Sequence, residues 1–525
     1  MATSQPNVLF IITDQHRADH VGFMGNDVVR TPNLDALADR GTVFESAWVS
    51  NPVCMPNRSS IMTGRVPSAH GVIFNDRSLE WGANTFVRQF RANGYRTGLL
   101  GKSHLQHGMS RNAVMPSPGG PSVADPYPAG WDTLEHGERY IDGAPDWPDD
   151  FYGFDTVELS IDHGARVSGH HYLWAVERGA DPADLLVPQT AENPRRRGSD
   201  LWWQIYDPPY DEAFHSTSFV TDRTIDFIER ASAQGSPWLA WASFPDPHHP
   251  FTPPGQWYDR HRPEDMEVPA TIDDPLEGAP EYLKRFQART VDKMRLWVAL
   301  TGATSPEVVQ AAMAANYGAI EMIDDRVGQI LATVDRLGQT DDTIVVFTAD
   351  HGDMMGDHGL LLKGFMHYRG TLQVPMLIVD PRRKQAPRSS SLASSIDLGP
   401  TLMDLCGVAP FHGIQGHSLT PILDDAAARV RDSVLIEEDV DAPAGVATPM
   451  PATIRSLITE GHRYTRYSSG EDGAYALGPD GDDECTNLAP LDPELRAELL
   501  GHLADAMMAH TEKSRLAPVA QPSAV

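Results

Sequence analysis

The segment best equipped for chemistry is residues 51–65, where a cysteine lies close to arginines. Cys54, Pro56 and Arg58 form the pattern Cys-x-Pro-x-Arg, and a short helix is expected to begin there. The N–H groups and the dipole at a helix start favour an anion, and Arg58, about one turn further on, adds a positive charge. Cys54 is therefore either a small buried apolar residue or an activated thiolate nucleophile.

Carboxylates and histidines also follow three apolar runs that are predicted to be buried strands, at residues 7–13, 237–244 and 342–349. In a parallel sheet, ligands bind beyond the carboxyl ends of the strands, so side chains just after such runs can share one site. Each motif alone would be a cap or a turn, but three together favour a functional site. The motifs are, in chain order, Asp14-Gln15, Asp246-Pro247-His248-His249 and Asp350-His351-Gly352.

The elements that must position these groups alternate along the chain. A fourth apolar run at residues 374–379 is a further predicted strand. Between the runs, residues 305–338 have apolar side chains at three- and four-residue spacing, which indicates a long amphipathic helix, and Thr31-Pro32 opens a shorter one that Gly41 closes. This alternation predicts an α/β fold whose large, mostly parallel central sheet is flanked by helices.

Residues 107–216 interrupt the alternation. They are rich in Pro, Gly and aromatic residues and contain a basic run at residues 195–197. A loop-rich insertion of this length is typical of a lid, a pocket wall or an oligomer contact, so a homo-oligomer is one possibility. An accessory packing layer with solvated arginines is the alternative.

The pattern of residues along the chain changes again near residue 431. Short strand-like runs at 433–436 and 464–467 precede an acidic turn and an amphipathic helix over about 493–510. These features predict a small C-terminal α+β subdomain with a short antiparallel sheet. We therefore expect a catalytic domain at residues 1–430 and a subdomain at 431–525, with a disordered tail from about residue 517.

Composition excludes several classes of partner. The 525 residues include 42 basic and 72 acidic side chains, a formal net charge of −30, which disfavours nucleic acid and anionic membranes. Three cysteines are too few for a disulfide framework and fit a reducing compartment. The apolar run at residues 8–12 is shorter than a signal peptide or a membrane span needs, so a cytoplasmic location is expected.

The motifs taken together resemble those of the type I sulfatases, which belong to the alkaline phosphatase superfamily, and specifically the branch of arylsulfatases and phosphonate monoester hydrolases. The resemblance covers nearly the whole chain in family order. Its motifs are residues 7–15, Thr31-Pro32-Asn33-Leu34, Cys54-x-Pro56-x-Arg58 with Thr63-Gly64-Arg65, Gly101-Lys102-Ser103-His104, Pro247-His248-His249-Pro250, Asp350-His351-Gly352, Lys363, Val374-Pro375 and residues 395–402.

In that family the signature cysteine is oxidised to formylglycine, so the resemblance implies this change at Cys54 and a formylglycine-generating enzyme as the maturation partner. The hydrated aldehyde offers two hydroxyls. The first attacks sulfur to give a covalent sulfo-enzyme intermediate. Deprotonation of the second re-forms the aldehyde and expels sulfate.

The resemblance also implies one divalent metal ion. Oxygen-rich sites suit Ca²⁺, the usual metal of the family. This sequence has Gln15 where an aspartate is commonest and His351 where an asparagine is commonest, and these changes shift the preference toward Mn²⁺. The implied ligands are Asp14, Gln15, modified Cys54, Asp350 and His351.

Family roles extend to the basic residues. Lys102 and Lys363 are implied to neutralise the oxyanion, and Arg58 to hold the formylglycine and metal-side oxygens. His248, together with Lys363, is implied to protonate the leaving oxygen, and His104 to act as the base that releases sulfate.

Three further polar residues have less defined roles. His249 and His358 are interpreted as neighbours that shape a turn or orient other groups. Asn75 lies where related enzymes contact a substrate oxygen, but a residue in this position can equally form a turn.

The leading hypothesis is a sulfuric ester hydrolase that cleaves a small aryl or alkyl sulfate monoester. The alternative is a phosphonate monoester or phosphodiester hydrolase with the same site, and promiscuity between the two is expected. Sulfatases keep the lysine and histidine of Gly101-Lys102-Ser103-His104, whereas the phosphonate branch tends to replace them, which favours the sulfatase. A hypothesis of another class is a non-catalytic binding protein with unmodified Cys54.

Overall fold

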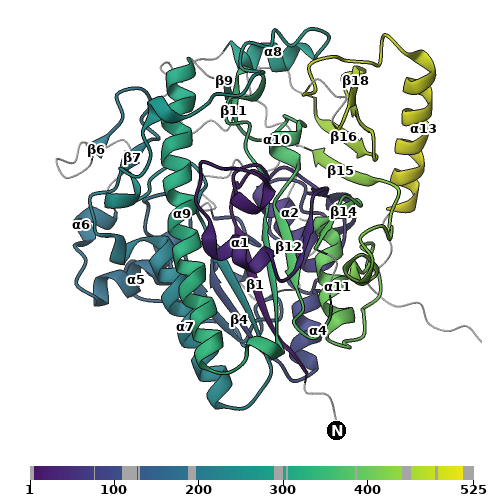
Figure 1. Ribbon diagram of the computed structural model, residues 1–525. Helices are drawn as coiled ribbons and strands as arrows, with labels where there is room; N and C mark the ends of the chain where they lie inside the picture. The colour runs from purple at the N-terminus through teal and green to yellow at the C-terminus, as the bar shows by residue number, and fades with distance from the viewer. Residues whose placement is uncertain are drawn as a thin grey trace, which may run out of the picture.

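The computed structural model describes residues 5–75, 77–108, 127, 130–186, 197–288, 300–302, 305–384, 387–439, 451–478 and 483–511. Within these ranges the central sheet has eight strands, and all neighbouring pairs are parallel except those that β12 forms with β10 and β2 (Figure 1). The strands, in spatial order, are β13 (Arg388–Ser389), β2 (Thr42–Phe44), β12 (Met376–Val379), β10 (Thr343–Ala349), β1 (Asn7–Thr13), β8 (Trp238–Phe244), β4 (Arg96–Gly101) and β5 (Thr156–Leu159).

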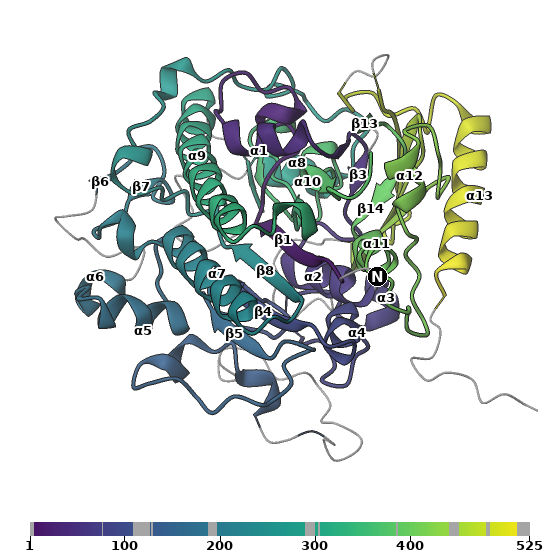
Figure 2. The same cartoon turned by 60° about the horizontal axis from the view of Figure 1, so that its bottom comes forward.

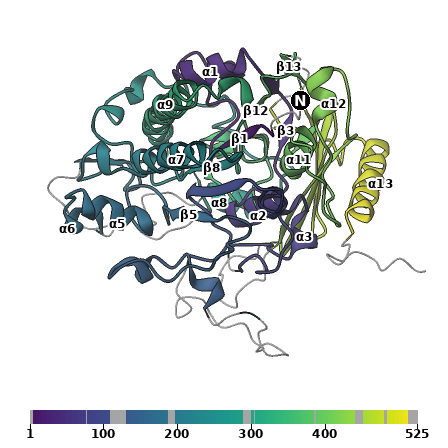
Figure 3. The ribbon, with the colours of Figure 1, turned by 90° about the horizontal axis from the view of Figure 1, so that it is seen from below.

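Helices cover both faces of this sheet, which confirms the predicted fold class (Figures 2 and 3). Along β1, Val8, Phe10 and Ile12 pack into one hydrophobic cluster and Leu9 and Ile11 into the other, as the alternation of side chains along a strand requires. The first cluster includes residues of α2 (Cys54–Thr63), α4 (Phe86–Ala92) and α11 (Leu398–Leu405), and the second includes residues of α1 (Pro32–Ala38), α7 (Ser216–Ala233) and α9 (Pro306–Arg336).

The predicted strands and the long helix occur where the sequence placed them. α9 begins at Pro306, because proline at the first helical position needs no N–H partner, and it ends at Arg336. The strand predicted at residues 374–379 is β12, and it runs antiparallel to β10. A short apolar run carries no information on strand direction, because direction depends on the path of the connecting chain.

The insertion at residues 107–216 is more regular than expected in its described parts. It supplies β5, which extends the central sheet beside β4, and helix α5 (His170–Glu177), whose Trp174 packs edge-on against Phe219 of α7. These contacts support the accessory packing layer. Of the basic run, only Arg197 lies within the described residues, and it pairs with Asp207 and Asp259.

The C-terminal part contains a separate antiparallel sheet (Figure 1). Within the described residues its four strands are β15 (Val434–Asp439), β16 (Thr453–Ile458), β17 (His462–Tyr467) and β18 (Asp472–Ala476), and α13 (Pro493–Ala509) packs beside them. The tail from residue 517 lies outside the described residues. Two hydrogen bonds join β15 to the residues before Cys54: Glu437 N donates to Ser50 O (2.9 Å), and Asn51 Nδ2 donates to Glu437 O (2.6 Å).

The remaining elements are short. They are the helices α3 (Pro67–His70), α6 (Pro182–Leu185), α8 (Glu281–Gln287), α10 (Arg369–Leu372) and α12 (Thr420–Asp424), and the strand pairs β3 (Ala47–Trp48) with β14 (Ala393–Ser394), β6 (Arg197–Gly198) with β7 (Tyr206–Asp207), and β9 (Leu300–Gly302) with β11 (Leu360–Leu362). Among the described residues, no helix is both long and apolar enough to cross a membrane.

Candidate functional site

The carboxyl ends of the central strands converge on Cys54. Asp14 follows β1, Lys102 follows β4 and Asp350 follows β10, while Cys54 is the first residue of α2. Backbone hydrogen bonds hold the strand ends in register: Asp350 N donates to Thr13 O (3.1 Å) and Lys102 N to Ser243 O (2.9 Å). Segments far apart in the sequence thus meet at one edge of the sheet, as parallel topology requires.

Four side chains at this edge have the geometry of a metal site. One ligand atom each from Asp14, Cys54, Asp350 and His351 lies within 4.8 Å of the others. His351 Nε2 is 3.5 Å from Asp14 Oδ1, 3.6 Å from Asp350 Oδ1 and 3.1 Å from Cys54 Sγ. His351 Nδ1 lies 2.9 Å from the carbonyl oxygen of Gly352, to which it donates, so Nε2 keeps its lone pair for a ligand.

The other oxygen of each carboxylate is held by a cation. Asp350 Oδ2 accepts from Arg58 Nε at 2.7 Å, and Asp14 Oδ2 pairs with Lys102 Nζ. Burial by itself raises the pKa of Asp14, but Lys102, Lys363 and Arg58 outweigh burial and hold that pKa well below its usual value. Asp14 is therefore held in its ionised form, which is the form in which a carboxylate binds a metal ion.

Two cations also face Cys54 or its surroundings. Lys363 Nζ lies 3.1 Å from Cys54 Sγ and 3.0 Å from His351 Nε2. Arg58 is completely buried, and its Nη2 has no hydrogen-bond partner among the described residues, although Asp14 Oδ2 is 3.7 Å away. A buried guanidinium N–H without a partner is costly, so this group is suited to bind an oxygen that enters the site.

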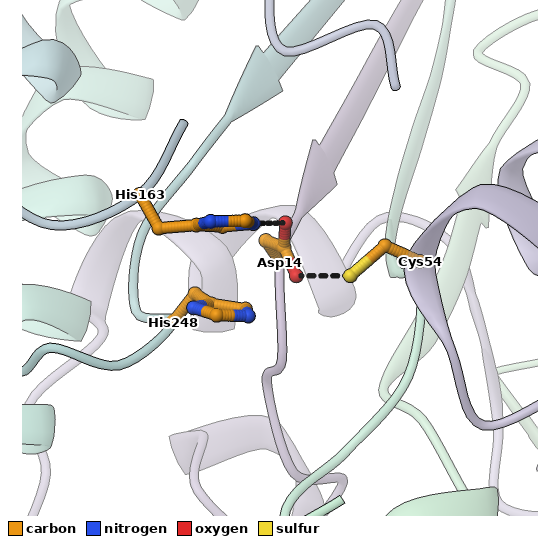
Figure 4. Close-up of side chains that lie close together, drawn as sticks. All are labelled: Asp14, Cys54, His163 and His248. Atoms are coloured by element: carbon orange, nitrogen blue, oxygen red, sulfur yellow. Dashed lines mark hydrogen bonds and ion pairs between the residues drawn. The ribbon is translucent and has the colours of Figure 1, made fainter. Parts of the chain in front are cut away.

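A stack of imidazoles forms the opposite wall. The His163 ring lies 3.7 Å from that of His248, and His248 lies 4.0 Å from His249, with both pairs nearly parallel. His163 Nε2 also pairs with Lys102 Nζ and lies 3.7 Å from Asp14 Oδ2. Figure 4 shows His163 and His248 side by side, facing the Asp14 and Cys54 side chains.

His163 is the residue that sequence reasoning missed. It comes four residues after β5, a strand that lies within the insertion. Like the predicted site residues, it therefore follows the carboxyl end of a strand of the central sheet. The signal was Asp162-His163 after the short run Thr156-Val157-Glu158-Leu159. That run alternates with a charged residue and resembles an exposed loop more than a buried strand, because β5 lies at the edge of the sheet.

Burial and nearby cations lower the pKa values of His248 and His249 in this wall, which favours their neutral forms. Burial lowers the pKa of His248 well below its usual value, and the charges of His163 and Lys363 lower it further. The pKa of His104 is lowered in the same way, by burial and then by Lys102. Neutral imidazoles accept protons, so these two can act as bases until an anion offsets the surrounding cations.

His104 lies at the edge of the site. Its ring is 6.0 Å from that of His163, and its buried Nδ1 has no hydrogen-bond partner among the described residues. Its backbone adopts the left-handed conformation (φ 54°), and Glu135 fixes it by accepting from His104 N at 2.7 Å. A non-glycine residue held in this conformation is typical of a site that constrains its side chain.

Two other predicted residues make different contacts. Gln15 joins the carboxylates through its backbone N–H, which donates to Asp350 Oδ1 at 3.1 Å, while its side-chain Oε1 lies 3.0 Å from His249 Nδ1. Asn75 Oδ1 accepts from Met55 N at 3.1 Å, so it satisfies an N–H group at the start of α2. Its contact with a substrate remains a prediction.

Comparison with known proteins assigns the family. The Sulfatase family model matches residues 6–408, so the chain belongs to the sulfatase family. An arylsulfatase from Clostridium perfringens is 27% identical over 435 residues, which cover 82% of this chain and 81% of that protein. A choline-sulfatase from Rhizobium meliloti is 27% identical over 420 residues, covering 78% and 69%.

Among solved structures, the crystal structure of the phosphonate monoester hydrolase of Agrobacterium radiobacter superposes with a TM-score of 0.75. It is 26% identical and the match covers 96% of this chain and 95% of that one. This likeness supports the resemblance to the sulfatase and phosphonate monoester hydrolase branch that the motifs indicated.

Proposed function

We propose that this sulfatase-family chain hydrolyses sulfate monoesters of small aryl or alkyl alcohols at Cys54. The observation that carries the proposal is the surroundings of the Cys54 side chain: Asp14 Oδ1 at 3.5 Å, His351 Nε2 at 3.1 Å and Lys363 Nζ at 3.1 Å. The sulfur of Cys54 therefore lies close both to atoms that can bind a metal ion and to the ammonium group of Lys363. A tetrahedral anion bound there meets a nucleophile and charge neutralisation together.

The donor set supports a bound divalent cation. The carboxylates of Asp14 and Asp350 and the imidazole of His351 converge, and Gln15 is the fourth ligand we propose from the chain. Mixed oxygen and nitrogen donors are compatible with Ca²⁺ and with Mn²⁺. When bound, the ion supplies positive charge that favours the ionised form of a nucleophile at position 54.

We further propose that Cys54 is oxidised to formylglycine during maturation, by a formylglycine-generating enzyme. The Cys-x-Pro-x-Arg pattern and the position of Cys54 at the first residue of α2 support this modification. The hydrated aldehyde supplies an oxygen nucleophile, which is better suited than a thiol to attack sulfur and then release sulfate.

We assign the binding of the sulfate group and the transfer of protons to residues of this chain. Lys102, Lys363 and the unpartnered N–H of Arg58 hold the sulfate oxygens. The negative charge of the substrate offsets these cations, which raises the pKa of His248 and lets it donate a proton to the leaving oxygen. His104, with its unpartnered buried Nδ1, accepts the proton whose removal releases sulfate.

The runner-up is hydrolysis of phosphonate monoesters, which the structural likeness to the Agrobacterium radiobacter enzyme favours. The buried Lys102, paired with Asp14 and His163, favours sulfate esters instead, because the phosphonate branch tends to lack this lysine. Initial rates on an aryl sulfate and an aryl phosphonate monoester with the same leaving group separate the two. We expect a higher kcat/KM on the sulfate, and a large excess on the phosphonate would overturn the assignment.

The modification itself is tested by the mass of the peptide that contains Cys54, taken from protein made in its native host. We expect the mass of an aldehyde at position 54. A thiol there, together with no gain in activity after co-expression of a formylglycine-generating enzyme, would instead favour a non-catalytic binding protein.

A further inference from the structure

A second group of metal-ligating side chains lies outside the proposed catalytic centre, where Asp274, His358 and Cys485 meet. One ligand atom from each residue lies within 4.8 Å of the other two, and His358 Nδ1 is 2.6 Å from Asp274 Oδ2. The His358 and Asp274 side chains are only 2% and 7% exposed, and Cys485 is half-buried. Carboxylate, imidazole and thiolate are the three donor types that zinc takes in proteins.

Neighbouring groups hold two of the ligand residues in place. Gln287 Nε2 donates to the backbone oxygens of both Asp274 (2.7 Å) and His358 (2.8 Å), so one side chain fixes the two segments relative to each other. The ring of Tyr368 lies 4.2 Å from that of His358. Partners that orient ligand residues in this way are a regular feature of protein metal sites.

The third ligand residue is fixed through its neighbour. Glu484, directly before Cys485, accepts from Arg369 N at 2.7 Å and pairs with the buried Arg463. The contact with Arg369 joins the C-terminal segment to the start of α10, directly after Tyr368, whose ring packs against His358.

The backbone around the cluster is constrained. His358, Asp483 and Glu484 all have positive φ angles, of 53°, 52° and 66°. Residues with side chains adopt this conformation rarely, and they persist in it where surrounding structure requires a particular side-chain direction. Here two of the three loops that form the cluster carry such residues.

A pocket of about 480 Å³ borders the cluster. Its lining includes His358 itself, Thr271, Asp357, Arg17, Arg369 and Glu484. Of the three ligand residues His358 lines this pocket, whose volume is large enough to hold a water molecule beside that side chain.

We propose that Asp274, His358 and Cys485 bind Zn²⁺, with a water molecule from the pocket completing a tetrahedral site. Binding releases the proton of the Cys485 thiol, while the imidazole of His358 keeps its one proton on the nitrogen that does not bind, so that the thiolate and the Asp274 carboxylate balance the charge of the ion. The site cross-links the C-terminal segment to the loop between His351 and Lys363. It therefore stabilises the segment that carries two residues of the catalytic centre.

Cobalt spectroscopy tests the proposal, because Co²⁺ replaces Zn²⁺ and a thiolate ligand gives a charge-transfer band. Cys54 is itself a thiol near metal ligands, so the test uses full-length Cys54→Ala protein, stripped of metal and then supplied with Ca²⁺. Addition of Co²⁺ is expected to produce the band with one equivalent of cobalt. The band is expected to disappear in Cys54→Ala/Cys485→Ser and to persist in the matched control Cys54→Ala/Cys406→Ser.

Absence of the band in Cys54→Ala, or its survival after Cys485→Ser, would overturn the proposal. A second measurement needs no variant: the rate at which iodoacetamide alkylates Cys485 in the wild-type protein, read by peptide mass. Zn²⁺, but not Ca²⁺, is expected to slow this rate by at least about tenfold, since a coordinated thiolate is withdrawn from reaction. An unchanged rate at saturating Zn²⁺ would also contradict the proposal. Neither measurement depends on the reaction that the protein catalyses.

Discussion

The centre around Cys54 and the cluster of Asp274, His358 and Cys485 use the same three side-chain types in different surroundings. At Cys54, Lys363 lies 3.1 Å from the sulfur, and Lys102 and Arg58 bind the carboxylates. At the second cluster, the buried Arg463 pairs with Glu484, which is not one of the three ligands. Carboxylate, imidazole and thiol together can hold a cation. In the function we propose, the cations placed among these groups at Cys54 allow that site also to bind and transform an anion.

The largest expected difference between the two sites is the effect on activity of removing each sulfur in turn. Cys54→Ala is expected to lower kcat/KM for an aryl sulfate by on the order of 10⁴- to 10⁶-fold, because the nucleophile is lost. Cys485→Ser is expected to change kcat/KM by less than about threefold, because a remote stabilising contact does not touch the substrate. A Cys54→Ala variant that keeps a tenth of the activity would remove Cys54 from the mechanism.

Removing the lysine side chains near Cys54 is expected to have the next largest effect on kcat. Lys102→Ala and Lys363→Ala are each expected to lower kcat by about 10²- to 10³-fold, the usual loss when one group that stabilises a developing negative charge is deleted. The exposed Lys384 provides a matched control, and Lys384→Ala is expected to behave as wild type. Steady-state kinetics on an aryl sulfate give the answer. Equal small losses in all three variants would mean that kcat depends on the total charge of the protein and not on the positions of Lys102 and Lys363 near Cys54.

The imidazole wall is expected to contribute less. His248→Ala should lower kcat by about 10²-fold through loss of the proton donor, most strongly for substrates with poor leaving groups. His163→Ala should cost about tenfold, because His163 positions the His248 ring and Lys102 without transferring a proton. The control is His502→Ala on the exposed face of α13. The positioning role of His163 would be contradicted by a steeper dependence on the leaving group than His248→Ala shows.

His171, a buried histidine outside both clusters, is expected to make the stability of the folded protein depend on pH. Burial lowers the pKa of His171 from its usual 6.5 to about 3, so the unfolded state binds more protons than the folded state between these values. Stability therefore rises with pH across that window, and the contribution of His171 is lost as the pH falls below about 6.5.

For His171 alone, the free energy of unfolding is expected to fall by about 2 kcal/mol between pH 7 and pH 5. His171→Gln, which can still donate to the backbone oxygen of Phe214, should reduce the pH dependence of the free energy of unfolding, measured by urea denaturation, by that amount. An unaltered pH dependence would show that His171 becomes protonated in the folded protein.

Much of this molecule could be predicted from local sequence. The buried strands were visible because residues such as Val8 to Ile12 are apolar on both faces, and the carboxylates and histidines after them were expected to share one edge. The helix that begins at Cys54 was visible from its proline and its pattern of residues. These features depend on short stretches of chain and on a general rule of parallel sheets.

The sequence by itself thus determined the fold class, the family and most residues at the Cys54 edge. Only the tertiary structure decided that β12 runs antiparallel, that His163 stacks on His248, and that Asn75 caps α2. The same holds for the meeting of Asp274, His358 and Cys485, which come from three distant segments. Such contacts follow from the paths of loops and from which faces pack together, and no short stretch of sequence encodes either.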